Sequence, residues 1–95
     1  MPSFVILSKL APDALRQPSD LKKLAETVSA KIKKECPTVR WKESFATLGQ
    51  FDVVDIVEAD SPVDAEKAAM IIRADGHADT ETLFATPWKE FLNEL

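Results

Sequence analysis

The sequence has few of the residues that usually reveal a function. Its 95 residues include one Cys and one His, so we expect neither an intrachain disulfide nor a zinc-type set of ligands. Its two Gly residues provide no Gly-rich loop of the kind that cradles phosphate groups. Its apolar runs, such as Phe4–Leu7, are far shorter than the roughly 20 residues of a membrane span. We therefore expect no metal, no cofactor and no membrane partner.

Composition and charge favour a folded protein that does not bind a polyanion. Apolar residues make up 45% of the chain and charged residues 29%, as in ordinary globular domains, so we expect a single domain over residues 1–95. The net charge is −4, whereas nucleic-acid binding needs a concentrated basic surface. The N-terminus lacks the basic and apolar regions of a secretory signal. We expect a cytoplasmic protein with no nucleic-acid partner.

The first third of the chain predicts a strand and a helix. Ser3–Lys9 is apolar at consecutive positions, which is typical of a strand buried on both faces. Residues 11–18 contain two prolines and predict a turn with a short helical piece. A helix should begin at Ser19 or Asp20 and end before Pro37. Its inner stripe should comprise Leu21, Leu24, Ala25, Val28 and Ile32.

The middle of the chain predicts a hairpin. Residues 38–48 alternate in polarity, which indicates an edge strand covered on one face. The covered side should carry Val39, Trp41 and Phe45. Gly49-Gln50 suits a two-residue primed turn, and the return strand over 51–58 is apolar on both sides.

The last third predicts a second helix, an edge strand and a short C-terminal helix. Ser61-Pro62 marks the start of the second helix, with Asp64 in a capping box, and Gly76 should end it in the left-handed conformation. The inner stripe of this helix should comprise Ala65, Ala68, Ala69 and Ile72. A strand of mixed polarity follows over 78–86. The apolar residues of the final helix are Trp88, Phe91 and Leu92.

This order predicts an α+β, ferredoxin-like βαββαβ fold with a short C-terminal helix. Right-handed crossovers place both long helices on one face of the sheet. The opposite face should then expose apolar side chains of the two central strands, a larger patch than soluble monomers usually carry. We expect a second copy to cover it, with two sheets packed face to face in a homodimeric α/β barrel. The alternative is that the C-terminal helix folds back over its own sheet.

The hairpin segment also resembles a known family. Thr47–Ala59 is similar to the signature of GYD-domain proteins, a Gly-x-Tyr-Asp block followed by a hydrophobic strand that ends in Glu-Ala. Phe4–Asp13 and Gly76–Leu83 resemble the family's first strand and its late Thr-x-Thr-Leu pattern. Phe51 stands at the Tyr position, and Asp55 interrupts a strand that is usually apolar. The resemblance implies a ferredoxin-like, dimeric α/β-barrel protein, and it implies no established activity.

Three residues are candidates for binding a ligand: Trp41, Asp55 and His77. An acid among Val and Ile in a central strand is costly to bury without a partner. Asp55 therefore either anchors a ligand in the dimer cavity, pairs with Lys or Arg of the neighbouring strand, or meets water at the rim. His77 follows the expected end of the second helix, and without a visible nucleophile a structural role is favoured over that of a general base. Trp41 either walls an apolar pocket or belongs to the core or interface.

We therefore expect a GYD-type homodimer, or a higher oligomer, that binds a small apolar molecule or serves as an assembly module. The alternative is a cofactor-independent monooxygenase-type enzyme acting in the cavity of the dimeric barrel, which is an analogy of fold. Catalysis requires Trp41, Asp55 or His77 to converge within hydrogen-bond reach of a common point, whereas binding does not.

Overall fold

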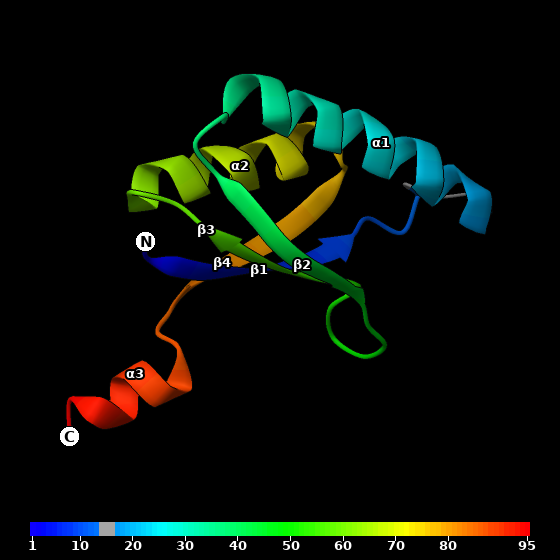
Figure 1. Ribbon diagram of the computed structural model, residues 1–95. Coiled ribbons are helices and arrows are strands. Elements are labelled where there is room, and N and C mark those ends of the chain that lie inside the picture. Colours follow the sequence, from blue (N-terminus) through cyan, green and yellow to red (C-terminus); the bar gives the residue numbers. More distant parts are fainter. Residues whose placement is uncertain (14–16) are drawn as a thin grey trace.

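The computed structural model describes residues 1–13 and 17–95 as one antiparallel sheet with two long helices on one face and a short helix near its end (Figure 1). The elements in chain order are β1 (Ser3–Leu10), α1 (Pro18–Glu35), β2 (Arg40–Ala46), β3 (Val53–Glu58), α2 (Pro62–Asp75), β4 (Ala78–Ala85) and α3 (Trp88–Asn93). The predicted ferredoxin-like order is confirmed. Residues 14–16 of the turn expected over 11–18 lie outside the described residues.

The sheet has the strand order β2-β3-β1-β4 and places the two most apolar strands in its centre. Opposite residues in β1 and β3 include Ile6 with Asp55 and Val5 with Ile56. Because side chains alternate along a strand, the first pair faces the helices and the second faces the open side. This alternation divides the apolar residues of the two central strands between two different surfaces.

The core lies between the sheet and α2. Phe4, Ile6 and Val57 point to this side and are buried. The predicted inner stripe of α2 is also buried: Ala65, Ala68, Ala69 and Ile72. Alanine side chains are short, so α2 can pack closely against β4.

Helix α1 packs against α2 and stands farther from the strands (Figure 1). The Lys31 ammonium and the Asp75 carboxylate join the two helices at 2.9 Å, and this hydrogen-bonded ion pair raises the pKa of Lys31. Of the predicted stripe on α1 only Ile32 is buried. Leu24 and Val28 are half-buried, because the space beneath them is not filled by protein.

The start of α1 differs from the prediction by one to two residues. The helix begins at Pro18, and Gln17 rather than Ser19 or Asp20 is the capping residue. The backbone N–H of Gln17 donates to Asp20 Oδ2 at 3.3 Å. Proline suits the first helical position because its φ is fixed and its missing N–H would have no partner there.

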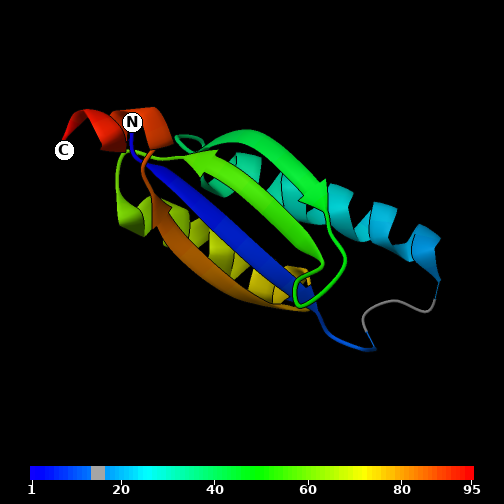
Figure 2. The same cartoon turned by 90° about the horizontal axis from the view of Figure 1, so that it is seen from below.

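The open face of the sheet carries the apolar surface that the sequence predicts. Val5, Leu7, Val54 and Ile56 of the central strands are half-buried there, and Phe45 and Leu83 on the edge strands are exposed. Figure 2 shows the strands from this side, with both long helices behind them and α3 beyond the end of the sheet. Helix α3 therefore leaves this face uncovered, and its own Trp88 is 72% exposed.

The connection between β2 and β3 is longer than the predicted two-residue turn. It spans residues 47–52, where the Thr47 N–H donates to the Asp52 carbonyl at 2.9 Å and Gly49 adopts a φ of +119°. Phe51 and Asp52 are part of this loop and not of the return strand. The Asp52 carboxylate accepts the Leu10 N–H at 2.8 Å, so it fixes the loop to the end of β1.

The end of α2 also corrects the prediction. Gly76 has a φ of −92°, and the left-handed conformation belongs to His77, with a φ of 50°. Glycine is needed at position 76 for close packing, because an added Cβ would lie 2.5 Å from the Ile72 carbonyl oxygen. At the start of α2, Ser61 is the N-cap as predicted, but its side chain makes no capping hydrogen bond.

Candidate functional site

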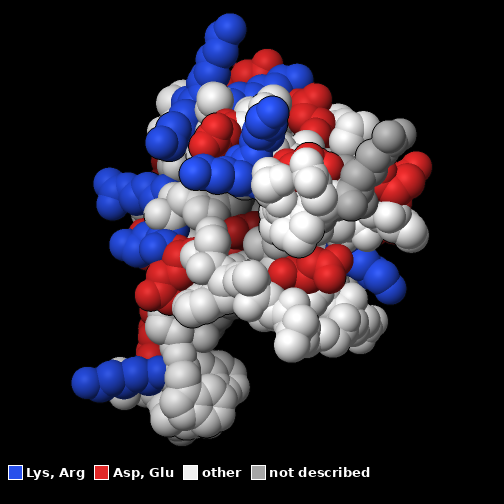
Figure 3. Space-filling model, turned by 90° about the vertical axis from the view of Figure 1, so that its right-hand side faces the viewer, with Lys and Arg blue, Asp and Glu red and all other residues white. Residues whose placement is uncertain are grey.

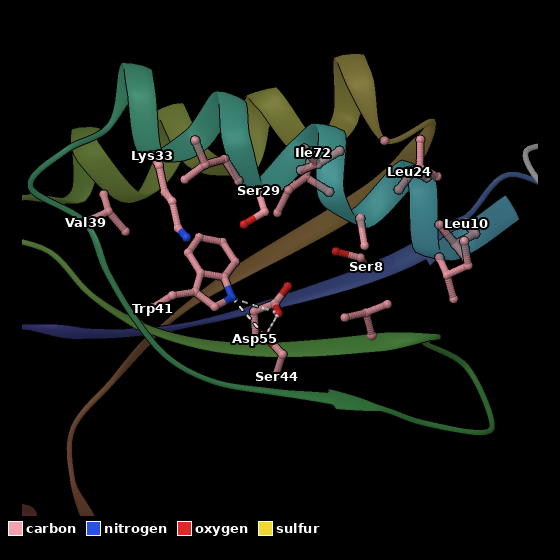
Figure 4. A pocket seen from close by; sticks show the side chains of 17 residues that line it. Ser8, Leu10, Leu24, Ser29, Lys33, Val39, Trp41, Ser44, Asp55 and Ile72 are labelled. Carbon is pink, nitrogen blue, oxygen red and sulfur yellow. Dashed lines mark hydrogen bonds between the residues drawn. The ribbon is translucent and has the colours of Figure 1, made fainter. Parts of the chain in front are cut away.

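The structure contains a cavity of about 490 Å³ between α1 and the strands β1, β2 and β3. Its roof is the apolar stripe of α1, with Ile72 of α2 near the middle of the view and Leu10 of β1 at the right-hand end in Figure 4. The roof residues are Leu21, Leu24, Ala25, Val28 and Ile32. Apolar carbon makes up most of this lining, so the cavity suits a molecule with an apolar body.

A polar cluster occupies the floor of the cavity (Figure 4). Trp41 Nε1–H donates to Asp55 Oδ1 at 3.1 Å and lies 2.9 Å from Ser44 Oγ. The Ser44 hydroxyl donates to the same Asp55 oxygen at 2.6 Å. Asp55 is 6% exposed, so these two donors replace the water that its carboxylate would otherwise bind.

A β-bulge in β2 brings this cluster together. The pairing of β2 with β3 shifts between Trp41 and Glu43, so that Trp41 lies opposite Val57 and Ser44 lies opposite Asp55. In a regular strand two residues three positions apart point to opposite faces, and the extra residue of a bulge restores them to the same face. The predicted alternation is therefore wrong at Phe45, which faces the open side opposite Val54.

Two polar atoms of the floor remain available to a ligand. Ser8 is 3% exposed, lines the cavity, and its Oγ has no hydrogen-bond partner among the described residues. Asp55 Oδ2 likewise has no partner in the described part of the chain, because both donors reach Oδ1. Ser8 and Asp55 come from neighbouring strands and face the same side of the sheet. A buried hydroxyl without a partner in the protein is unusual, and an ordered water or another small molecule can satisfy it.

Charged and polar side chains also reach the cavity from α1. Lys33 extends from the last turn of α1 toward the indole of Trp41, and Ser29 points down beside it (Figure 4). Lys33 itself is exposed to solvent. The cavity thus has one acidic group on its floor and one basic group at its border.

The structure brings together two of the three predicted site residues. Trp41 and Asp55 are in direct contact, whereas His77 is exposed and does not line the cavity. The carbonyl of His77 accepts the Ala11 N–H at 2.9 Å, which ties the end of β1 to the start of β4. Asp55 pairs with Trp41 and Ser44 rather than with a Lys or Arg, and it faces the helices rather than the open face on which a dimer cavity was expected.

Sequence reasoning missed Ser8, Ser44 and Lys33. Ser8 carried a usable signal, because it shares one face of β1 with the buried Phe4 and Ile6, where a hydroxyl is out of place. Lys33 stands among several lysines of α1 and has no distinguishing feature in the sequence.

Other chemistry is limited in the described residues. Among residues 1–13 and 17–95, no group of three His, Cys, Asp or Glu side chains could hold a metal ion. Cys36 is buried in the core, and desolvation raises the pKa of its thiol, which keeps it protonated at neutral pH. None of the helices described here combines the length and apolarity that a membrane span requires.

The chain is similar to known proteins over nearly its whole length. The chain is 28% identical over 99 residues to a Thermus thermophilus protein named "Glutamine synthetase and cystathionine beta-lyase binding protein", covering 100% of this chain and 99% of that protein. A de novo designed protein with a ferredoxin fold, solved by NMR in solution, is 17% identical with a TM-score of 0.47, covering 92% of this chain and 86% of the designed one. The family model described as the GYD domain matches residues 4–94. The chain therefore belongs to the GYD domain family.

Proposed function

We propose that this protein is a homodimeric binding protein for a small, mainly apolar molecule held between α1 and the sheet. The observation that carries the proposal is the cavity of about 490 Å³, with an apolar roof and a buried polar floor. Its volume lies within the roughly 300–1,000 Å³ typical of small-molecule sites.

The packing of α1 supports a bound molecule. Leu21, Leu24 and Val28 have the spacing of core residues, yet they remain half-buried because α1 packs on α2 and not on the strands. Burying a side chain of this size completely is worth about 1.5–3 kcal/mol. An apolar ligand would cover all three side chains at once, so its binding would stabilise the fold by completing their burial.

The open face of the sheet supports the homodimer. Its apolar side chains run across all four strands, and the acids Glu43, Glu58 and Glu81 lie around them on the same face. Figure 3 shows most of the basic side chains gathered over the helices, with few charges on the underside toward α3. Such a patch with a charged border is typical of a surface that binds a copy of itself.

A second candidate function is the binding of partner enzymes. The relative from Thermus thermophilus is named for binding glutamine synthetase and cystathionine β-lyase, and it matches this chain over its full length. The exposed apolar residues of α3 offer a surface for such a partner: Trp88, Phe91 and Leu92. Mixing the purified protein with purified glutamine synthetase in native mass spectrometry tests this candidate, with Trp88→Ala as the variant that should lose the complex.

The monooxygenase-type alternative draws no support from His77, which lies outside the cavity. Trp41 and Asp55 do meet within hydrogen-bond reach in the cavity, with the Ser44 hydroxyl beside them. This contact holds the carboxylate in place through Oδ1 and does not by itself supply the chemistry of an oxidation, whereas the apolar lining directly supports binding. Binding therefore remains the better proposal.

The ligand proposal is tested by filling the cavity. Ala25 lines it, whereas Ala30 on the same helix does not, so Ala25→Phe and Ala30→Phe form a matched pair. With 2-methylnaphthalene as a fluorescent apolar probe, we expect binding to the wild type and to Ala30→Phe, and at least a roughly tenfold weaker Kd for Ala25→Phe. Equal Kd values in the two variants, or no binding to the wild type, would contradict the proposal.

A further inference from the structure

We infer that the ligand of this cavity carries a hydroxyl group, which binds between Ser8 and Asp55 at the floor. This inference rests on the proposed function and specifies the chemical class of molecule that the cavity accepts. It starts from two atoms, Ser8 Oγ and Asp55 Oδ2, that no described residue satisfies.

The network around Asp55 determines which kind of atom the ligand must present. Trp41 and Ser44 both donate to Oδ1, and both come from β2 on the far side of Asp55 from β1. Oδ2 is therefore left as an acceptor at the surface of the cavity, where a ligand that displaces its water must supply a donor in return. A ligand group that only accepts hydrogen bonds, such as a ketone, an ether or a carboxylate, would leave Oδ2 unsatisfied.

Ser8 adds the second requirement. Its hydroxyl can donate one hydrogen bond and is almost completely buried, and no described residue accepts that proton. A ligand hydroxyl donates to Asp55 Oδ2 and accepts from Ser8 Oγ–H through one oxygen atom. An ammonium group lacks the acceptor, so it would leave the Ser8 proton unused.

The charge around the cavity disfavours an anionic head group. Such a head would face the Asp55 carboxylate on the floor, whereas Lys33 lies exposed at the border. A cationic head would be attracted by Asp55, so the choice between an ammonium and a hydroxyl depends on the Ser8 proton, which only the hydroxyl can accept. The apolar roof accommodates the rest of the molecule.

A series of probes of similar shape tests the head group. We would measure Kd by fluorescence at pH 7 for 2-naphthylmethanol, 2-methylnaphthalene, 2-(methoxymethyl)naphthalene and 2-naphthylmethylamine, which is protonated at this pH. We expect the alcohol to bind about tenfold more tightly than the hydrocarbon or the methyl ether, the difference typical of hydrogen bonds to a charged group. The ammonium probe should bind less tightly than the alcohol.

Two variants tie this preference to the floor. Ser8→Ala should reduce the preference for the alcohol over the hydrocarbon about fivefold without lowering the unfolding midpoint, because its hydroxyl has no partner to lose. In Asp55→Asn the amide oxygen must face the donors Trp41 and Ser44, so the amide NH2 group takes the place of Oδ2. This group donates a hydrogen bond, so the methyl ether should then bind as tightly as the alcohol. Ser19→Ala, on the exposed start of α1, is the control and should behave as the wild type.

The outcomes separate this inference from the proposed function. Hydrocarbon binding without any preference for the alcohol overturns the hydroxyl assignment and leaves the cavity as an apolar site. Tightest binding of the ammonium probe also overturns it, in favour of an amine ligand. If none of the four probes binds the wild type, both the inference and the proposed function fail.

Discussion

The open face of the sheet yields a sharp prediction about assembly. Val54 lies near the centre of this face, on β3, opposite Leu7 of β1 and Phe45 of β2. All three side chains are apolar, so a charge at position 54 would find no partner in these neighbours. We predict that Val54→Asp converts a homodimer to folded monomers, because a carboxylate here is tolerated in water but not beneath a second sheet.

The size of this effect follows from the burial of Val54. It is half-buried in the single chain, so a partner would cover only its remaining half, worth about 1 kcal/mol. An unpaired carboxylate in the interface adds at least about 2 kcal/mol in each protomer. A twofold interface contains the substitution twice, so the penalty is about 6 kcal/mol, or roughly 10⁴-fold in the dimer Kd.

Sedimentation velocity over a concentration series from nanomolar to micromolar measures this change directly. Far-UV circular dichroism should show that Val54→Asp remains folded. Met70→Asp provides the control, because Met70 is 62% exposed on α2, on the helix side of the sheet, and should keep the wild-type assembly. A wild type that is monomeric at micromolar concentration, or a Val54→Asp variant that dimerises as tightly as the wild type, would refute the reasoning.

Two further predictions concern the fold itself. Gly76→Ala should lower the thermal midpoint by about 5–15 °C in a circular dichroism melt, since its Cβ would lie 2.5 Å from the Ile72 carbonyl oxygen, and an unchanged midpoint would contradict this packing. Burial raises the pKa of Cys36, so iodoacetamide at pH 8 should modify this thiol only after unfolding in guanidinium. The thiol of Cys36 ionises at lower pH in the unfolded chain than in the folded one, so its contribution to the free energy of unfolding is complete below about pH 8.5 and is lost as the pH rises through the raised pKa. Rapid alkylation of the folded protein would contradict the raised pKa and the burial of this thiol.

The sequence predicts the architecture because the main signals are strong and local. Proline at the start of α2, the alanine stripe along that helix and the consecutive apolar residues of β1 each specify one element, and the short connections leave few ways to join them. The same alternation predicts the apolar open face. These features are decided by backbone geometry and side-chain spacing, which a single sequence contains.

The site was predicted only in part because it depends on two irregularities. The bulge in β2 changes which side Ser44 and Phe45 face, and a pattern of alternating residues carries no sign of an inserted one. The end of α2 shows the same limit, because glycine at position 76 serves close packing while His77 takes the left-handed conformation. In both places tertiary contacts decide between conformations that the local sequence permits equally.

The cavity is harder still to foresee, because an apolar stripe on a helix looks the same whether it packs on a sheet or lines a hollow. Helix α2 meets the strands through alanines and lies close to them, whereas the leucines of α1 are large and yet stay half-buried. The difference lies in where each helix is supported: α1 packs on α2 and is tied to it by Lys31 and Asp75, so it is held over the strands without resting on them. The floor beneath it combines a buried acid, two donors and an unpartnered hydroxyl, an arrangement that a sequence selected only for stability would replace with apolar side chains. The gap under α1 and the polar floor are thus the two features on which the proposed small-molecule site rests, and both arise from tertiary packing that the local sequence does not specify.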